Sequence, residues 1–172
     1  MKPIGKLHRS SMPTKLVDTF TSTGIKYNRH PEMIQALRSG RGRPTSLQIS
    51  CTNKCNLRCV FCSTDERNLK LEWKLDDLIQ AIFNFNLCGI KTVEFSGGGD
   101  PTLYPHLPEI VEYTKKLGLK LGMITNGILL KDVPHGTLES FDWIRVSMVT
   151  LDYRKDLQFP DPWPKNVTLG MS

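Results

Sequence analysis

Two hydrophobic periods alternate along this chain, and the alternation constrains its fold more than any other feature. Short apolar runs typical of strands are followed by stretches in which apolar side chains recur every three to four residues, as on one face of a helix. One such stripe is Leu75, Leu78, Ile79 and Ile82, and a second spans residues 107–117. Strands that alternate with helices predict βαβ units and a parallel sheet, which is an α/β fold. The expected strands are 46–50, 92–95, 120–125 and 143–148, with a short terminal strand at 167–171.

Three cysteines lie in the loop that we expect after the first strand. Cys55, Cys59 and Cys62 have the spacing C-x3-C-x2-C, so their thiolates can converge on one face of a short loop. Cysteine thiolates hold iron–sulfur clusters. A cubic cluster has four irons, so three cysteines leave one iron with an open coordination position, as in catalytic rather than structural metal sites. Parallel α/β sheets place their active sites at the carboxyl ends of strands, where this loop begins.

A fourth cysteine, Cys51, extends the run to C-x3-C-x3-C-x2-C. Four cysteines could close a tetrahedral zinc site, so a non-enzymatic zinc-binding structural or regulatory module is the alternative from another functional class. Zinc sites usually pair two Cys-x-x-Cys motifs across a longer loop, which this run lacks, and Cys51 could instead pack inward at the strand end. We expect Cys88 to lie in the core, because free Cys is among the most buried residue types.

A run of three glycines follows the second expected strand. Gly97, Gly98 and Gly99 precede Asp100 and Pro101. Glycine lets the backbone approach a ligand closely and adopt positive φ, although a tight turn would also explain the run. Because neighbouring parallel strands end at the same edge of a sheet, we expect this glycine loop to lie beside the cysteine loop.

Together the two motifs resemble those of the radical S-adenosylmethionine (radical SAM) superfamily, over roughly residues 46–150. The resemblance implies that the three cysteines hold a [4Fe–4S] cluster. The open iron would bind the amino and carboxylate groups of S-adenosyl-L-methionine, whose reductive cleavage gives a 5′-deoxyadenosyl radical. Gly98, Gly99, Asp100 and Pro101 match the family's Gly-Gly-Glu-Pro element, in which backbone carbonyls and the acid receive the ammonium group. Here Asp replaces the usual Glu.

The resemblance extends to three further residues of the expected cofactor site. Phe61 is expected to pack against the adenine or the cluster, Asn126 matches a Thr-Asn-Gly turn, and Ser147 lies where the family places a polar group for the ribose. Turn chemistry alone would also explain Asn126, and a backbone bond would explain Ser147. From the sequence, Lys54 and Arg58 place positive charge beside the thiolates, which lowers a thiol pKa.

The chain divides into a basic leader and one folded domain. Residues 1–44 hold nine Lys or Arg against two acids, out of a net charge of +6, and we expect a partly disordered leader with one short helix at 31–37. Such a leader can bind RNA, although a solvated arm is favoured. Residues 45–172 are the expected radical SAM core, a shortened parallel βα barrel. The family's partial barrel has six βα units, of which this chain supplies about four, so its C-terminal part is expected to be truncated or atypical.

These observations predict a radical SAM enzyme that abstracts hydrogen from a substrate the sequence does not identify, and an inactive remnant stays open. A small glycyl-radical-enzyme activase is the more specific alternative. The expected partners are S-adenosyl-L-methionine, an electron donor such as a flavodoxin or ferredoxin, and a macromolecular substrate or second subunit that closes the barrel at an unpaired edge near Ser147. No apolar stretch is long enough for a membrane span, which predicts a cytoplasmic protein.

Overall fold

A computed structural model describes residues 30–172 and contains one parallel sheet of five strands. The strands follow one another across the sheet in chain order, and each pairs in parallel with the next. This sequential order is that of a βα barrel rather than of a doubly wound sheet. The strands are β1 (Ser46–Ile49), β2 (Thr92–Phe95), β3 (Lys120–Thr125), β4 (Trp143–Val146) and β5 (Thr168–Met171).

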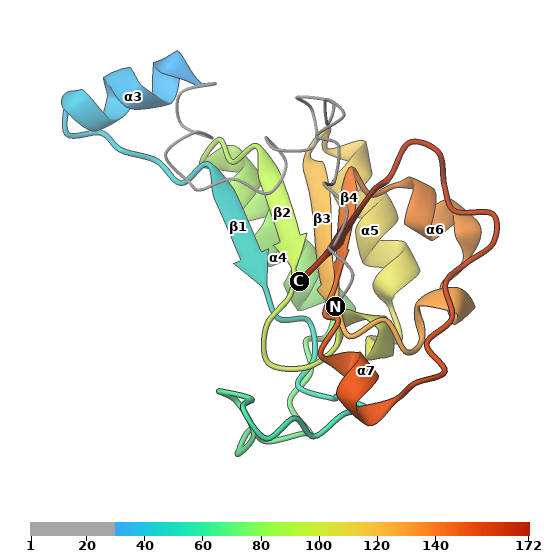
Figure 1. Cartoon of the computed structure of the whole chain (residues 1–172). Coiled ribbons are helices and arrows are strands. Elements are labelled where there is room, and N and C mark those ends of the chain that lie inside the picture. Colours follow the sequence, from blue (N-terminus) through green and yellow to red (C-terminus); the bar gives the residue numbers. More distant parts are fainter. Residues whose placement is uncertain (1–29) are drawn as a thin grey trace, which may run out of the picture.

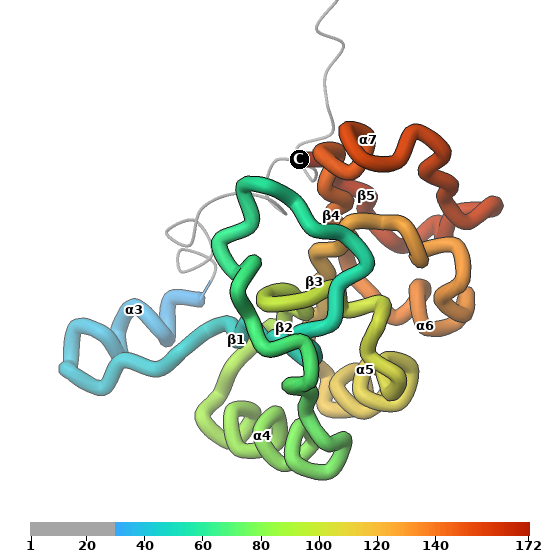
Figure 2. Tube along the Cα trace, turned by 90° about the horizontal axis from the view of Figure 1, so that it is seen from below, coloured from blue at the N-terminus to red at the C-terminus, as the bar shows by residue number. Residues whose placement is uncertain are grey.

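Helices cover one face of this sheet. The crossover helices α4 (Leu75–Leu87), α5 (Leu107–Lys116) and α6 (His135–Glu139) lie side by side along that face (Figure 2). The stripes predicted from the sequence explain the two longer helices, since Leu78 and Ile82 of α4 are fully buried. The remaining helices are α3 (Pro31–Arg38), α7 (Thr150–Tyr153) and the 3₁₀ turns η1 (Pro101–Leu103) and η2 (Leu130–Asp132).

The core lies between the sheet and these helices. Alternate strand residues point towards the helices, and the strand register aligns Ile49, Phe95, Met123 and Ile144 in one buried row. Phe95 also meets Phe141 edge to face, with 6.2 Å between the ring centroids. Burial of this continuous apolar layer fixes the positions of the strand ends, which carry the candidate site.

The parallel α/β fold and the partial barrel are confirmed, and the terminal strand predicted at 167–171 is present as β5. The sequence analysis was wrong about the unpaired edge near Ser147, because β5 pairs with β4 there and Ile144 aligns with Leu169. Helix α6 was not predicted, since a five-residue helix shows too few turns for a hydrophobic stripe. Helix α3 lies where the sequence predicts one. Residues 1–29 of the expected leader fall outside the described residues. Among residues 30–172, no helix is long and apolar enough to cross a membrane.

Candidate functional site

The cysteine loop, here residues 51–64, begins directly after β1 and lies beyond the carboxyl ends of the strands (Figure 1). Cys55, Cys59 and Cys62 are all half-buried in it. In the described part of the chain, no three His, Cys, Asp or Glu side chains are grouped to hold one metal ion. A cubic cluster does not require three side chains that meet at one metal ion, because its three thiolates bind three different irons.

Two bonds tie the first half of the cysteine loop to the ends of β2 and β3. The Asp100 backbone N–H donates to the Lys54 carbonyl at 2.8 Å. The Asn126 side-chain amide donates to Asn56 Oδ1 at 2.7 Å, and the same Nδ2 lies 3.7 Å from Cys55 Sγ. Asn126 therefore does more than close a turn, because its amide places an N–H group on a cysteine sulfur.

Two further bonds fix the second half of the cysteine loop. The Val60 backbone N–H donates to the Tyr153 hydroxyl at 3.0 Å, which joins the loop to α7. The Thr64 hydroxyl donates to the Gly98 carbonyl at 3.2 Å and lies 3.4 Å from Cys62 Sγ. The sequence reasoning missed Tyr153, which lies 93 positions from Val60, and no local pattern could have revealed this contact.

The glycine run packs directly against the start of the cysteine loop. A Cβ at Gly99 would overlap the backbone of Asn53 and Lys54, and a Cβ at Gly98 would overlap the Asn53 side chain. Of the three glycines in the run, only Gly97 has positive φ, at 118°. The space that the missing side chains leave is thus filled by this chain's own backbone, so close loop-to-loop packing explains the run at Gly98 and Gly99.

Asp100 is 3% exposed and accepts hydrogen bonds from four groups. These donors are the N–H and hydroxyl of Thr102, at 2.9 and 2.5 Å, the Thr125 hydroxyl at 2.9 Å, and the Asn126 N–H at 2.7 Å. Because Thr125 ends β3 and Asp100 follows β2, the carboxylate holds two strand ends together. Its expected role as acceptor for the ammonium of S-adenosylmethionine stays a prediction, and the holding role adds to it.

The positive charge beside the thiols comes from a residue that the sequence analysis did not name. The Arg67 Nη1 lies 3.5 Å from Cys62 Sγ. Lys54 instead pairs with Glu72 at 3.1 Å, and Arg58 pairs with Asp65 at 3.3 Å. Lys54 and Arg58 are thus each paired with an acid, and their expected effect on the thiol pKa stays a prediction.

The three thiols differ in their surroundings. A hydrogen bond from Thr64 is the main reason that the pKa of Cys62 lies below its usual value, and Arg67 lowers it further. Burial raises the pKa of Cys59, and the negative charge of Cys55 and Cys62 raises it as well. Cys59 is therefore within electrostatic reach of both other thiols, as a shared site requires.

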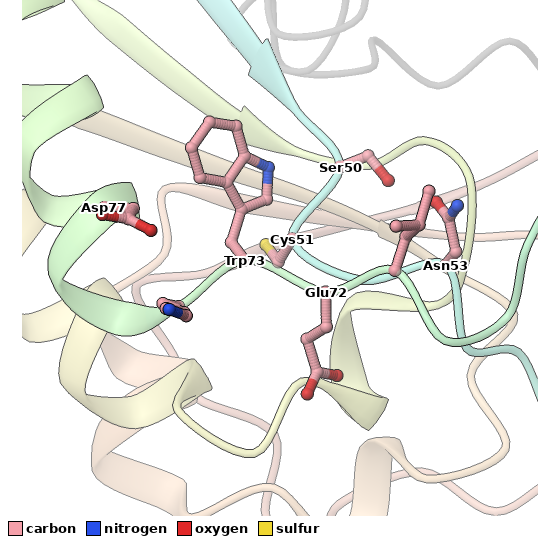
Figure 3. A pocket seen from close by; sticks show the side chains of 8 residues that line it. Ser50, Cys51, Asn53, Glu72, Trp73 and Asp77 are labelled. Atoms are coloured by element: carbon pink, nitrogen blue, oxygen red, sulfur yellow. The ribbon is translucent and has the colours of Figure 1, made fainter.

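Cys51 lies apart from these three thiols. Its sulfur points towards Trp73 in the wall of a cavity of about 410 Å³ between the end of β1 and the start of α4 (Figure 3). The side chain is 1% exposed, and burial raises the pKa of its thiol to about 12. The inward packing considered from the sequence is present, and it gives Cys51 a structural role in the wall of this cavity. Cys88 is exposed at the end of α4, so the expectation that it lies in the core was wrong.

Phe61 and Ser147 lie at the same edge of the sheet. Phe61 is 61% exposed in the cysteine loop. Ser147 is half-buried after β4, and its backbone N–H donates to the Thr125 carbonyl at 2.9 Å. Packing of Phe61 on a cofactor and a ribose contact by Ser147 stay predictions.

Comparison with known proteins decides the family. The model of the radical SAM superfamily matches residues 49–159, which include the cysteine loop, the glycine run and strands β2, β3 and β4. This chain belongs to the radical SAM superfamily. The family's cofactor pair is a [4Fe–4S] cluster and S-adenosyl-L-methionine, as the motifs led us to expect.

The relatives of this radical SAM chain include cyclases. A probable GTP 3′,8-cyclase of Methanococcus maripaludis is 37% identical over 111 residues, which are 62% of this chain and 37% of the relative. A GTP 3′,8-cyclase of Clostridium botulinum is 28% identical over 130 residues, which are 72% of this chain and 38% of the relative. The chain thus spans less than two fifths of the length of these relatives.

Solved structures share the radical SAM fold. SuiB of Streptococcus suis, bound to S-adenosylmethionine, aligns with a TM-score of 0.57 at 20% identity over 74% of this chain and 31% of SuiB. BtrN, in complex with AdoMet and 2-DOIA, aligns with a TM-score of 0.53 at 16% identity over 74% of this chain and 56% of BtrN. At these identities, the likeness establishes the partial barrel alone.

Proposed function

We propose that this chain binds a [4Fe–4S] cluster through Cys55, Cys59 and Cys62 and cleaves S-adenosyl-L-methionine reductively, to give a radical that abstracts hydrogen from a substrate. The observation that carries the proposal is the fixed cysteine loop beside the glycine loop, at the carboxyl edge of a radical SAM sheet. The donor set fits the cluster. It consists of three thiols, and N–H groups of Asn126 and Arg67 face the sulfurs of two of them.

The chain's own residues supply binding and orientation in this proposal. Gly98 and Gly99 bring the backbone against the cysteine loop, and their carbonyls would receive the ammonium of a bound S-adenosylmethionine. Asn126 and Ser147 follow neighbouring strands and would contact the nucleoside. Phe61 is exposed in the cysteine loop, where its ring can exclude water from a bound cofactor.

Removing any one of the three ligands should empty the site. Protein reconstituted anaerobically with iron and sulfide should bind about four irons per chain, and Ala at position 55, 59 or 62 should abolish the stable cluster. Cys88→Ala is the matched control, because Cys88 is exposed and lies outside the loop. Metal analysis and the visible spectrum give the readout. Unchanged iron in all three variants, or zinc in place of iron, would sink the proposal.

The names of the relatives suggest the first substrate to test. Relatives named GTP 3′,8-cyclase favour a nucleoside triphosphate over the glycyl-radical-enzyme alternative. A macromolecular substrate is also part of the proposal, since the structural neighbour SuiB was solved with a precursor peptide. A flavodoxin or ferredoxin is the proposed electron donor, and the cytoplasm the proposed location.

A further inference from the structure

Arg67 makes four hydrogen bonds that converge on the cysteine loop, one of them from Nη1 to the Thr64 hydroxyl at 3.4 Å. Its Nε donates to the Asn53 carbonyl at 2.8 Å, and its Nη1 donates to the Thr64 carbonyl at 2.7 Å and to Cys62 Sγ at 3.5 Å. The guanidinium therefore bridges both ends of the loop that carries the three cysteines. A planar fork of this kind cannot be reproduced by a lysine ammonium, which is a point charge on a flexible stem.

The charge of Arg67 is directed at the sulfur, and no carboxylate among residues 30–172 forms an ion pair with it. Its bonded partners are two neutral carbonyls, the Thr64 hydroxyl and one thiol, and the side chain is half-buried. Arg58 in the same loop has the opposite arrangement, because its guanidinium is 86% exposed and pairs with Asp65 at 3.3 Å. Two arginines of equal charge thus differ in whether the charge reaches a cysteine sulfur.

Hydrogen bonds to the sulfurs and nearby charge set the reduction potential of an iron–sulfur cluster. Reduction adds one electron from a low-potential donor and makes the cluster more negative, with no bond broken and no proton moved. A cation bonded to a ligand sulfur stabilises the more negative state, so it raises the potential.

We propose that Arg67 is a positioning residue that raises the reduction potential of the bound cluster through Cys62, while it holds the two ends of the cysteine loop together. This inference rests on the proposed function, since it needs a cluster on Cys62. Thr64 assists, because its hydroxyl lies 3.4 Å from the same sulfur and donates to the Gly98 carbonyl at 3.2 Å.

The test is an anaerobic potentiometric titration of the reconstituted full chain, followed by electron paramagnetic resonance of the reduced cluster. Arg67→Gln should reduce the ratio of reduced to oxidised cluster at a fixed potential about tenfold, which is a fall of about 59 mV for one electron. Arg58→Gln removes the same charge from the loop without touching a sulfur, so its midpoint should stay near that of the wild type. Arg67→Lys keeps the charge and should lie between the wild type and Arg67→Gln.

Iron content is measured on every variant beside the potential. If Arg67→Gln fails to hold iron while Arg58→Gln holds it, the midpoint potential of Arg67→Lys is compared with that of the wild type. A lower midpoint potential in Arg67→Lys supports the inference. Equal midpoints in the wild type, the Arg58 variant and whichever Arg67 variants hold iron would overturn it. A wild type that takes up no iron would instead refute the proposed function, and this inference with it.

Discussion

Gly99→Ala should detach the glycine loop from the cysteine loop and prevent stable cluster binding. A Cβ at this position would overlap the Asn53 and Lys54 backbone, which cannot turn aside as a flexible side chain would. The loop must then move, and the 2.8 Å bond from the Asp100 N–H to the Lys54 carbonyl is lost with it. Overpacking of this kind typically costs 1–3 kcal/mol, and with the lost bond we expect a loss of about 3 kcal/mol in the free energy of unfolding.

The matched control for this substitution is Gly136→Ala. A Cβ at Gly136 meets nothing within 4 Å, and the residue lies in helix α6, where Ala is favoured over Gly by about 0.5–1 kcal/mol. Denaturant unfolding of the apo proteins and iron content after reconstitution measure the two effects. A Gly99→Ala protein as stable as the control, with a full complement of iron, would show that the close approach of the two loops is not needed.

Asp100→Ala should destabilise the protein even when no cofactor is bound. The substitution removes the acceptor for the Thr125 hydroxyl and the Asn126 N–H at the end of β3. Buried donors without a partner cost about 1–3 kcal/mol each, so we expect a loss of about 2–4 kcal/mol in the free energy of unfolding of the apo protein. Asn126 should also shift, which would loosen its contact with Asn56 in the cysteine loop.

This outcome separates two roles for the Asp100 carboxylate. If the carboxylate serves only the ammonium of S-adenosylmethionine, the apo variant should unfold at the same denaturant concentration as the wild type. If the carboxylate also holds the ends of β2 and β3 together, the apo variant should unfold at a lower denaturant concentration, with an unchanged dependence of the unfolding free energy on denaturant. Asp132→Ala is the control, because Asp132 is exposed and surface substitutions usually change stability by less than about 0.5 kcal/mol.

The parts of the fold that followed from the sequence are those encoded by local periodicity. Strand β3 was predicted with its observed bounds, Lys120–Thr125, because its apolar run ends at an Asn-Gly turn. Helix α4 followed from its stripe of apolar residues. Pairing of β5 with β4 changed the predicted edge, since the pairing of strands is a tertiary property that a short run after a proline-rich segment does not reveal.

The cysteine and glycine motifs could be found from their spacing, but the residues that support them could not. Arg67 and Tyr153 reach the cysteine loop through side-chain geometry, and neither belongs to a motif. Lys54 and Arg58 are closer to the cysteines along the sequence, yet they form ion pairs with the acids at positions 72 and 65. Spacing along the chain was enough to propose the ligands, whereas the electrostatics of the site depended on the folded loop.

The central claim is that this radical SAM chain holds a cluster that cleaves S-adenosylmethionine. The most direct test is anaerobic incubation of the reconstituted, reduced protein with S-adenosylmethionine, and chromatographic measurement of 5′-deoxyadenosine and methionine. We predict slow release of both from the wild type without added substrate, and none from Cys59→Ala. A wild type that holds about four irons per chain yet neither binds S-adenosylmethionine nor releases 5′-deoxyadenosine would contradict the account.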